Sequence, residues 1–170
     1  MGLHLNLGSG QRKFDKPWIN IDVQNTHNPD IVADISNLPM FADDSAEIIV
    51  LHHVLEHFGC GEADGVLKEA WRILAPGGSF LIFVPEMRKI AQRWLVHEID
   101  DFIFMVNTYG AYQGDEHDRH RWGYDTMSLK KYIKSVLGVE AKLFDNRTIS
   151  GADMAVDWWT LGIEIIKENK

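Results

Sequence analysis

The stretch LHLNLGSGQRKFDKPWINIDV, Leu3–Val23, determines how the rest of the chain is interpreted. An apolar run leads into the turn Gly8-Ser9-Gly10, and a second apolar run ends in the acid Asp22. Glycines after a strand let the backbone approach a ligand, and an acid at the end of the next strand can accept hydrogen bonds from a ribose diol. The stretch therefore fits either a loop that binds a nucleoside-containing cofactor or a plain structural turn.

The dinucleotide-binding pattern G-x-G-x-x-G is incomplete here. Lys13 stands where that pattern has its third glycine. Asp22 follows Gly10 by 12 residues, whereas the dinucleotide spacing is about 20. The glycine turn alone leaves both interpretations open, and NAD is disfavoured.

Apolar segments alternate with helix-like ones along the chain, which is typical of βαβ units and a parallel sheet. Several runs are apolar throughout, as expected for strands covered on both faces. Seven strands are predicted, at Leu3–Leu7, Trp18–Asp22, Ile31–Ala33, Ala46–Leu51, Ser79–Val84, Val139–Phe144 and Trp158–Ile166.

Three helical segments are predicted from apolar periodicity. Glu62–Leu74 forms the first, and Ala75-Pro76-Gly77-Gly78 ends it and turns the chain into the next strand. A second helical patch covers Ile90–Phe104. The third, Thr126–Leu137, follows the capping residue Asp125 and precedes Gly138, a helix-ending glycine.

Composition limits the possible partners and compartments. The 170 residues fit one domain, 1–170, and a net charge of −8 argues against a nucleic-acid backbone as partner. The longest apolar runs are strand-sized, so no membrane span is expected. The N-terminus lacks the pattern of a secretory signal, and the single cysteine, Cys60, fits a reducing compartment. We therefore expect a cytoplasmic protein.

Four motifs occur in a characteristic order: LNLGSG, INID, VADISNLPMFADDSAEIIVLHHVLEHF and WRILAPGGSFLIFVP. This order closely resembles class I S-adenosylmethionine-dependent methyltransferases, and in particular their small "type 11" group. The resemblance is continuous over Leu3–Val84, and HRWGYDTMSLKKYIKSV is similar to the C-terminal segment of related enzymes. It implies a Rossmann-like α/β fold with a seven-stranded, mostly parallel sheet, an antiparallel last strand and helices on both faces.

The resemblance also implies a cofactor site for S-adenosylmethionine, which leaves as S-adenosylhomocysteine. Gly8, Ser9 and Gly10 would lie beneath its methionine part. Asp22 would bind the ribose hydroxyls, with Val23 beside the adenine. The remaining expected contacts are Asp34 and Ile35 with the adenine and Leu51 and His52 with the methionine. The short segment between Gly10 and the second strand implies that the usual first helix is reduced or irregular.

His53-Val54-Leu55-Glu56-His57 matches H-x-x-E-H, a zinc-hydrolase pattern in which two histidines bind the metal and the glutamate is a general base. A zinc site would need a third ligand, such as His97, His117 or His120. The alternative, favoured by the resemblance, is that His53 faces the transferred methyl group and that His57 is structural. We expect no metal.

The stretch DEHDRHRWGYD, Asp115–Asp125, is either a solvated charged loop or a substrate wall. In the second interpretation Arg119 or Arg121 pairs with an anionic group. Trp122 or Tyr124 then stacks on the substrate, and His117 or His120 accepts a proton. The surrounding segment 86–125 is the expected lid on the substrate side.

These observations predict a methyltransferase that transfers a methyl group to a small molecule by direct in-line displacement, with His53 and His120 as candidate catalytic residues. No N-P-P-Y or D-P-P-Y tetrapeptide follows the fourth strand, which argues further against a nucleic-acid substrate. A non-catalytic binding module on the same fold is the alternative, and a zinc hydrolase built on HVLEH is a more distant one.

Overall fold

A computed structural model of the chain describes all residues except 1, 112–115, 146–148, 153, 155–156 and 170. Its centre is one sheet in the strand order β3-β2-β1-β4-β5-β7-β6. The strands are β1 (Leu3–Leu7), β2 (Trp18–Asp22), β3 (Ile31–Val32), β4 (Ala46–His52), β5 (Leu74–Pro85), β6 (Lys142–Leu143) and β7 (Thr160–Ile166). The predicted seven-stranded sheet is confirmed.

Strand direction also follows the prediction. β1 pairs in parallel with β2 and β4, and β4 pairs in parallel with β5. β7 runs antiparallel to both of its neighbours, β5 and β6. The strand order reverses between β1 and β4. Ligands of open α/β sheets bind at the carboxyl ends of the strands beside such a reversal.

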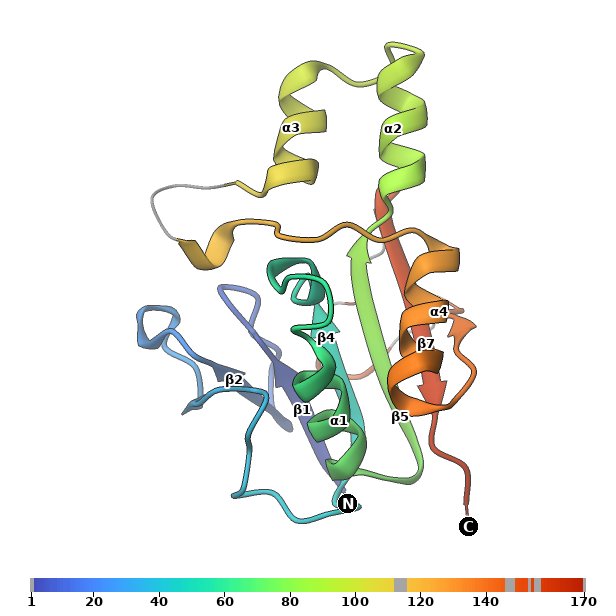
Figure 1. Cartoon of the computed structure of the whole chain (residues 1–170). Coiled ribbons are helices and arrows are strands. Elements are labelled where there is room, and N and C mark those ends of the chain that lie inside the picture. Colours follow the sequence, from blue (N-terminus) through green and yellow to red (C-terminus); the bar gives the residue numbers. More distant parts are fainter. Residues whose placement is uncertain (1, 112–115, 146–148, 153, 155–156, 170) are drawn as a thin grey trace.

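The main hydrophobic core lies between the sheet and two helices, α1 (Asp64–Ile73) and α4 (Thr126–Leu137). Both helices cover the same face of the sheet (Figure 1). They contact each other, and the Tyr132 hydroxyl of α4 donates a hydrogen bond to Asp64 of α1 at 2.7 Å. α4 begins at the predicted cap Asp125 and ends at Gly138, whose φ is +73°.

The opposite face differs from the expectation of helices on both sides. Its core cluster comes from strand residues such as Trp18 and Phe83 and from loop residues such as Phe14 and Met154. No helix residue of the described chain belongs to this cluster. The physical reason is the short connection between β1 and β2, because residues 11–17 hold no helix. The expectation that the usual first helix is reduced or irregular is therefore confirmed.

Two further differences concern helix and strand boundaries. β5 already begins at Leu74, and Ala75–Gly78 lies within it as an irregular segment where the pairing with β4 shifts register. The predicted helical patch Ile90–Phe104 is two helices, α2 (Met87–Leu95) and α3 (Asp101–Tyr109). Asp100 separates them because its carboxylate caps α3 by accepting from the backbone N–H of Ile103 at 2.8 Å.

The helices α2 and α3 stand beyond the carboxyl ends of the strands, on the same side as the turns that follow β1 and β4 (Figure 1). They pack against each other through the stacked rings of Trp94 and Phe104, whose centroids are 4.3 Å apart. Three 3₁₀ turns complete the described structure: η1 (Asn25–His27), η2 (Leu55–His57) and η3 (Glu116–Asp118). None of the described helices is long and apolar enough to cross a membrane.

Candidate cofactor and catalytic site

The glycine turn after β1 is tied directly to the end of β2. The backbone N–H groups of Gly8 and Ser9 both donate to the carbonyl of Ile21, at 2.8 and 3.0 Å. The N–H of Gly10 donates to Oδ2 of Asp22 at 2.7 Å. The turn and the acid that the sequence analysis paired therefore form one structural unit.

Both glycines of the turn have left-handed backbone conformations, with φ of +68° at Gly8 and +50° at Gly10. A Cβ at Gly8 would lie 2.7 Å from Cγ2 of Val54, so a larger residue does not fit. A Cβ at Gly10 would meet no atom within 4 Å. Gly8 is thus required by packing, whereas the space beside Gly10 is open to a ligand.

Asp22 has hydrogen-bonding capacity to spare. Its Oδ1 accepts from the N–H of Gln24 at 2.8 Å, and its side chain is largely buried. The His27 Nδ1 also lies 3.7 Å from Oδ1, so Oδ2, with its second lone pair, is the oxygen available to a further donor such as a ribose hydroxyl. The next residue, Val23, is 54% exposed, which leaves an apolar surface beside the acid.

Ser9 also fits a polar ligand. Its hydroxyl is buried, yet it has no hydrogen-bond partner among the described residues. A buried hydroxyl is normally satisfied by a protein group, water or ligand. The turn, Asp22 and Val23 together therefore fit the ribose and apolar parts of the predicted cofactor.

Of the two other residues predicted to contact the adenine, Asp34 lies at the surface and Ile35 in the core. Asp34 is exposed, and its Oδ1 accepts from the backbone N–H and the hydroxyl of Ser36, each at 2.8 Å. Its other oxygen has no hydrogen bond in the described structure. Ile35 belongs to the main core and is 7% exposed, so little of its side chain is available for a ring to pack on.

At the end of β4 the prediction needs a correction. Leu51 has no exposed surface and lies in the core, so its side chain cannot line the cofactor site. Its place in a strand covered on both faces explains this. His52, the last residue of β4, is also buried, and its ring stacks on Phe83 with centroids 5.0 Å apart.

His53 is held by contacts on both ring nitrogens. It has a left-handed φ of +56°, and its Nδ1 lies 2.9 Å from Oε1 of Glu56. Nε2 lies 3.4 Å from the hydroxyl of Thr160, and the ring packs on Trp159 at a centroid distance of 4.7 Å. A carboxylate that accepts from Nδ1–H leaves Nε2 as the basic nitrogen.

Glu56 is the centre of this region. Its carboxylate is 1% exposed, and its Oε2 has no hydrogen-bond partner among the described residues. Burial opposes ionisation, but the hydrogen bond from His53 outweighs it and lowers the pKa of Glu56 below its usual value. Glu56 is therefore an ionised acceptor at neutral pH.

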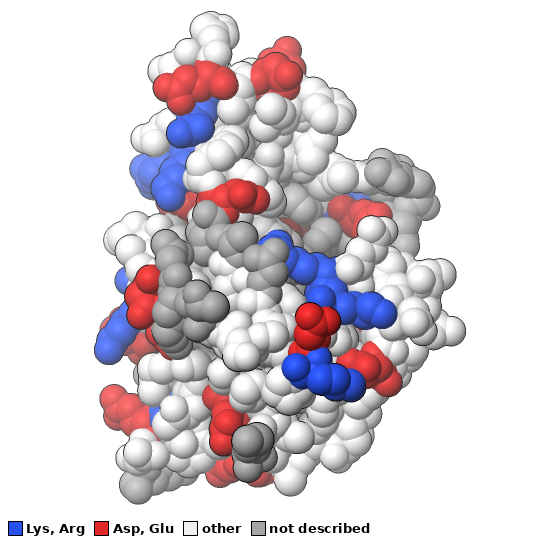
Figure 2. All heavy atoms as spheres, turned by 180° about the vertical axis from the view of Figure 1, so that it is seen from behind, with Lys and Arg blue, Asp and Glu red and all other residues white. Residues whose placement is uncertain are grey.

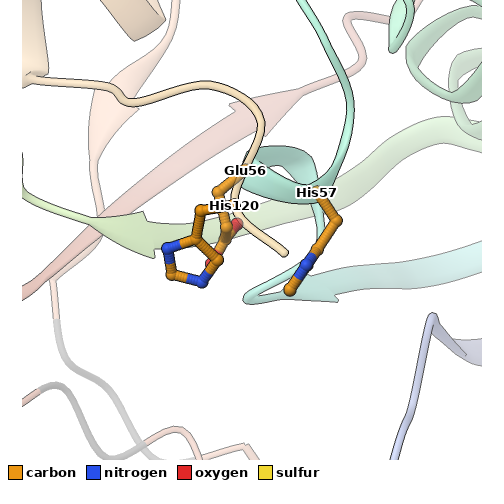
Figure 3. A group of neighbouring side chains, drawn as sticks. All are labelled: Glu56, His57 and His120. Atoms are coloured by element: carbon orange, nitrogen blue, oxygen red, sulfur yellow. The ribbon is translucent and has the colours of Figure 1, made fainter. Parts of the chain in front are cut away.

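Glu56, His57 and His120 converge from two distant segments of the chain (Figure 3). One oxygen or nitrogen atom from each lies within 4.8 Å of those of the other two. Burial lowers the pKa of His120, although Glu56 opposes the shift, so the neutral imidazole is favoured. His53 is not part of this group, so the pairing of His53 with His57 required by the zinc-hydrolase pattern is not formed among the described residues.

The predicted substrate segment is anchored on the same turn. The backbone N–H groups of Arg121 and Trp122 both donate to the carbonyl of Glu56, at 2.7 and 3.1 Å. Arg121 forms an ion pair with Glu62 at 2.7 Å, so its guanidinium already has an anionic partner. Trp122 is 45% exposed. His117, in η3, is exposed.

Tyr124 corrects the prediction for this segment. It was expected on the substrate wall, but it is 3% exposed in the main core and stacks on Tyr132. Burial raises the pKa of its hydroxyl. The Tyr124 carbonyl accepts from the N–H of Met87, and its ring packs inward among the core residues. Asp115, the first residue of the predicted wall, lies outside the described residues.

Residues 13–82 match the family model of a methyltransferase domain. Three solved structures each superpose on 99% of this chain. A putative S-adenosylmethionine-dependent methyltransferase from Methanococcus maripaludis has 16% identity, 78% coverage of that chain and a TM-score of 0.58. A possible histamine N-methyltransferase from Thermotoga maritima has 16% identity, 83% coverage and a TM-score of 0.60. The 1,6-didemethyltoxoflavin-N1-methyltransferase from Burkholderia thailandensis, with bound S-adenosylhomocysteine, has 12% identity, 72% coverage and a TM-score of 0.59.

This is the class I methyltransferase fold. The fold that the resemblance implied is therefore confirmed, and the family match over residues 13–82 supports S-adenosylmethionine as the cofactor. No curated protein matches the sequence.

Sequence reasoning missed two features of this candidate site. The first is the central position of Glu56, which the H-x-x-E-H pattern presented only as a possible general base. The second is the contact of His53 with Trp159 and Thr160, which were assigned to a packing strand. Only the antiparallel pairing of β7 with β5 brings these residues beside β4, and single-sequence patterns do not specify such long-range contacts.

Proposed function

We propose that the protein is an S-adenosylmethionine-dependent methyltransferase that acts on a small molecule. The hydrogen bond between the Gly10 N–H and the Asp22 carboxylate is the observation that carries the proposal. This bond connects the backbone of Gly10, which has open space beside it, to the Asp22 carboxylate, which can accept a further hydrogen bond. Both groups lie at the edge of the sheet where the domain family binds its cofactor. The methyltransferase-domain match and the strand order support it.

In this proposal the protein's residues bind and orient the reactants. Asp22 would accept from the ribose hydroxyls, Val23 would cover one side of the adenine, and the Gly8–Gly10 backbone would lie beneath the methionine part. Bound S-adenosylmethionine supplies a methyl group already activated by its sulfonium. The protein then needs to align the acceptor atom with the methyl group and to exclude water, so that direct in-line displacement follows.

His53 is the proposed base for the acceptor's proton. Glu56 holds its Nδ1–H, which leaves Nε2 to accept a proton, as in other dyads of a carboxylate and a histidine. The imidazolium formed would be stabilised by the Glu56 carboxylate. His120 was predicted for the same task; its Nδ1 faces a neutral carbonyl, that of Asn107 at 2.9 Å, rather than a carboxylate, so we propose His53 as the base.

The substrate would enter under α2 and α3. These helices stand over the carboxyl ends of the strands (Figure 1), and the exposed Trp122 lies on the segment that returns beneath them. On the face of the molecule shown in Figure 2, acidic and basic side chains are interspersed. Together with the net charge of −8, this supports a small acceptor rather than a nucleic acid.

The test is transfer from methyl-labelled S-adenosylmethionine to a panel of hydroxyl-, amine- and carboxylate-bearing small molecules. We expect label in at least one class of acceptor, and we expect His53→Asn to reduce turnover without changing the affinity for S-adenosylhomocysteine. Binding of S-adenosylhomocysteine without labelling of any acceptor would favour the alternative, a non-catalytic binding module on the same fold.

A further inference from the structure

In the mechanism above Glu56 only orients His53 through its Oε1, and His57 and His120, which lie beside Glu56, have no role. η2 supplies Glu56 and His57, and the segment after η3 supplies His120. Figure 3 shows the three side chains close together, with one ligand atom of each within 4.8 Å of the others. From this arrangement we propose that they form a binding site for one divalent transition-metal ion.

The hydrogen bonds of the two histidines prepare them as ligands. Nδ1 of His57 lies 3.1 Å from the carbonyl of Arg119, and Nδ1 of His120 lies 2.9 Å from the carbonyl of Asn107. A carbonyl only accepts, so each Nδ1 carries the proton and each Nε2 keeps its lone pair. Metal-bound histidines almost always have their other nitrogen fixed in this way.

Glu56 supplies the charge. Its Oε1 accepts from His53, while Oε2 is buried without a hydrogen-bond partner among the described residues. A buried carboxylate oxygen without a partner is costly, and a bound cation would remove that cost. One oxygen of the Glu56 carboxylate lies within 4.8 Å of a ring nitrogen of each imidazole.

The backbone holds the two segments in place before any ion binds. The N–H groups of Arg121 and Trp122 both donate to the carbonyl of Glu56. Around a tetrahedral zinc ion, ligand atoms lie about 3.4 Å apart, given metal–nitrogen distances of about 2.1 Å. The three ligand atoms, which lie within 4.8 Å of one another, would therefore draw closer by side-chain rotation when an ion binds.

The donor set defines the kind of ion. Two imidazoles and one carboxylate suit zinc and the neighbouring transition metals, whereas magnesium and calcium prefer oxygen ligands alone. Three protein ligands leave at least one coordination position open for water or for an oxygen of a bound molecule. This set differs from the zinc-hydrolase pattern, because His53 orients Glu56 and does not join the ligands.

The experiment uses the full chain without S-adenosylmethionine, so its outcome does not depend on the proposed methyl transfer. The purified protein is treated with a chelator, and Zn²⁺, Co²⁺ and Mg²⁺ are titrated by calorimetry. Co²⁺ absorption spectra report the ligand geometry. We expect one Zn²⁺ or Co²⁺ per chain and no comparable binding of Mg²⁺.

Variants identify the ligands. His57→Ala and His120→Ala should each weaken Zn²⁺ binding by more than about 100-fold, since even loss of a supporting contact costs about 10- to 100-fold. His97→Asn is the matched control, because His97 is exposed and lies outside the group. His57 is only half-buried, so its variant keeps the core intact, and circular dichroism verifies folding. Absence of stoichiometric Zn²⁺ or Co²⁺ binding, or equal affinity in the folded variants and the control, would overturn the proposal.

Discussion

Gly10 and Asp22 are joined by a hydrogen bond of 2.7 Å from the Gly10 backbone N–H to Oδ2 of the aspartate. The two residues belong to the turn after β1 and the end of β2, and this bond fixes the turn against the neighbouring strand. A short charge-assisted hydrogen bond of this kind is stronger than one between neutral groups. The position of the glycine turn is therefore set by the protein before any cofactor binds.

Replacing Asp22 tests the binding role of this unit. We expect Asp22→Asn to weaken S-adenosylhomocysteine binding by about 10- to 100-fold, because the amide loses the negative charge and half of the acceptor capacity. Asp15→Asn is the control, since it removes the same charge at an exposed position before β2. Calorimetry compares the two variants. Equal affinities would mean that Asp22 supports only the turn.

The space beside Gly10 gives a second test. Gly10→Ala and Gly138→Ala both place a Cβ in open space at a left-handed φ, of +50° and +73°. Both should lose about 1–2 kcal/mol of stability from backbone strain. Only Gly10→Ala should also weaken S-adenosylhomocysteine binding, because its methyl group enters the cofactor space. A matching loss of affinity in Gly138→Ala would assign the effect to general destabilisation.

Sequence reasoning succeeded for features that depend on nearby residues. The strands β1 and β2 begin and end where the apolar runs predict, and α4 has the predicted bounds because Asp125 and Gly138 specify both of its ends. The acid at the end of β2 lies against the glycine turn because parallel neighbours end at the same edge. These features follow from periodicity, capping and adjacency.

The errors concern residues whose environment is set by distant segments. Leu51 and Tyr124 were placed on ligand surfaces, yet both are buried in the main core. Sequence position locates each near the carboxyl edge but does not say which way its side chain points. The His57–His120 contact likewise depends on a chain return across 63 residues, which no local pattern encodes.

Tyr124 and Trp122 differ in burial, so we expect their replacement by alanine to have different effects on stability. Tyr124→Ala should cost about 3–5 kcal/mol of unfolding free energy, as expected for truncation of a buried aromatic residue. Trp122→Ala should change stability by no more than about 0.5 kcal/mol, because its side chain is largely at the surface. Urea denaturation measures both. A larger loss in Trp122→Ala than in Tyr124→Ala would contradict the assignment.

The cap of α4 predicts a pH dependence of stability. The backbone N–H of Ser128 and the guanidinium of Arg88 lower the pKa of Asp125 to about 2. A depressed carboxylate pKa stabilises the fold above the unfolded value of about 3.9, and this contribution is lost as the pH falls toward 2. Asp125→Ala should therefore cost about 1 kcal/mol at pH 7, and the difference should shrink between about pH 4 and pH 2. Denaturation curves at a series of pH values provide the measurement; a difference that is constant down to pH 2 would exclude the ionised cap.

The most direct test of the cofactor site is calorimetric titration of the full chain with S-adenosylhomocysteine, alongside NAD and ATP. The joined glycine turn and Asp22, without the third glycine of a dinucleotide site, predict micromolar binding of S-adenosylhomocysteine and no comparable binding of the other two. Absence of S-adenosylhomocysteine binding, or tighter binding of NAD, would contradict the account.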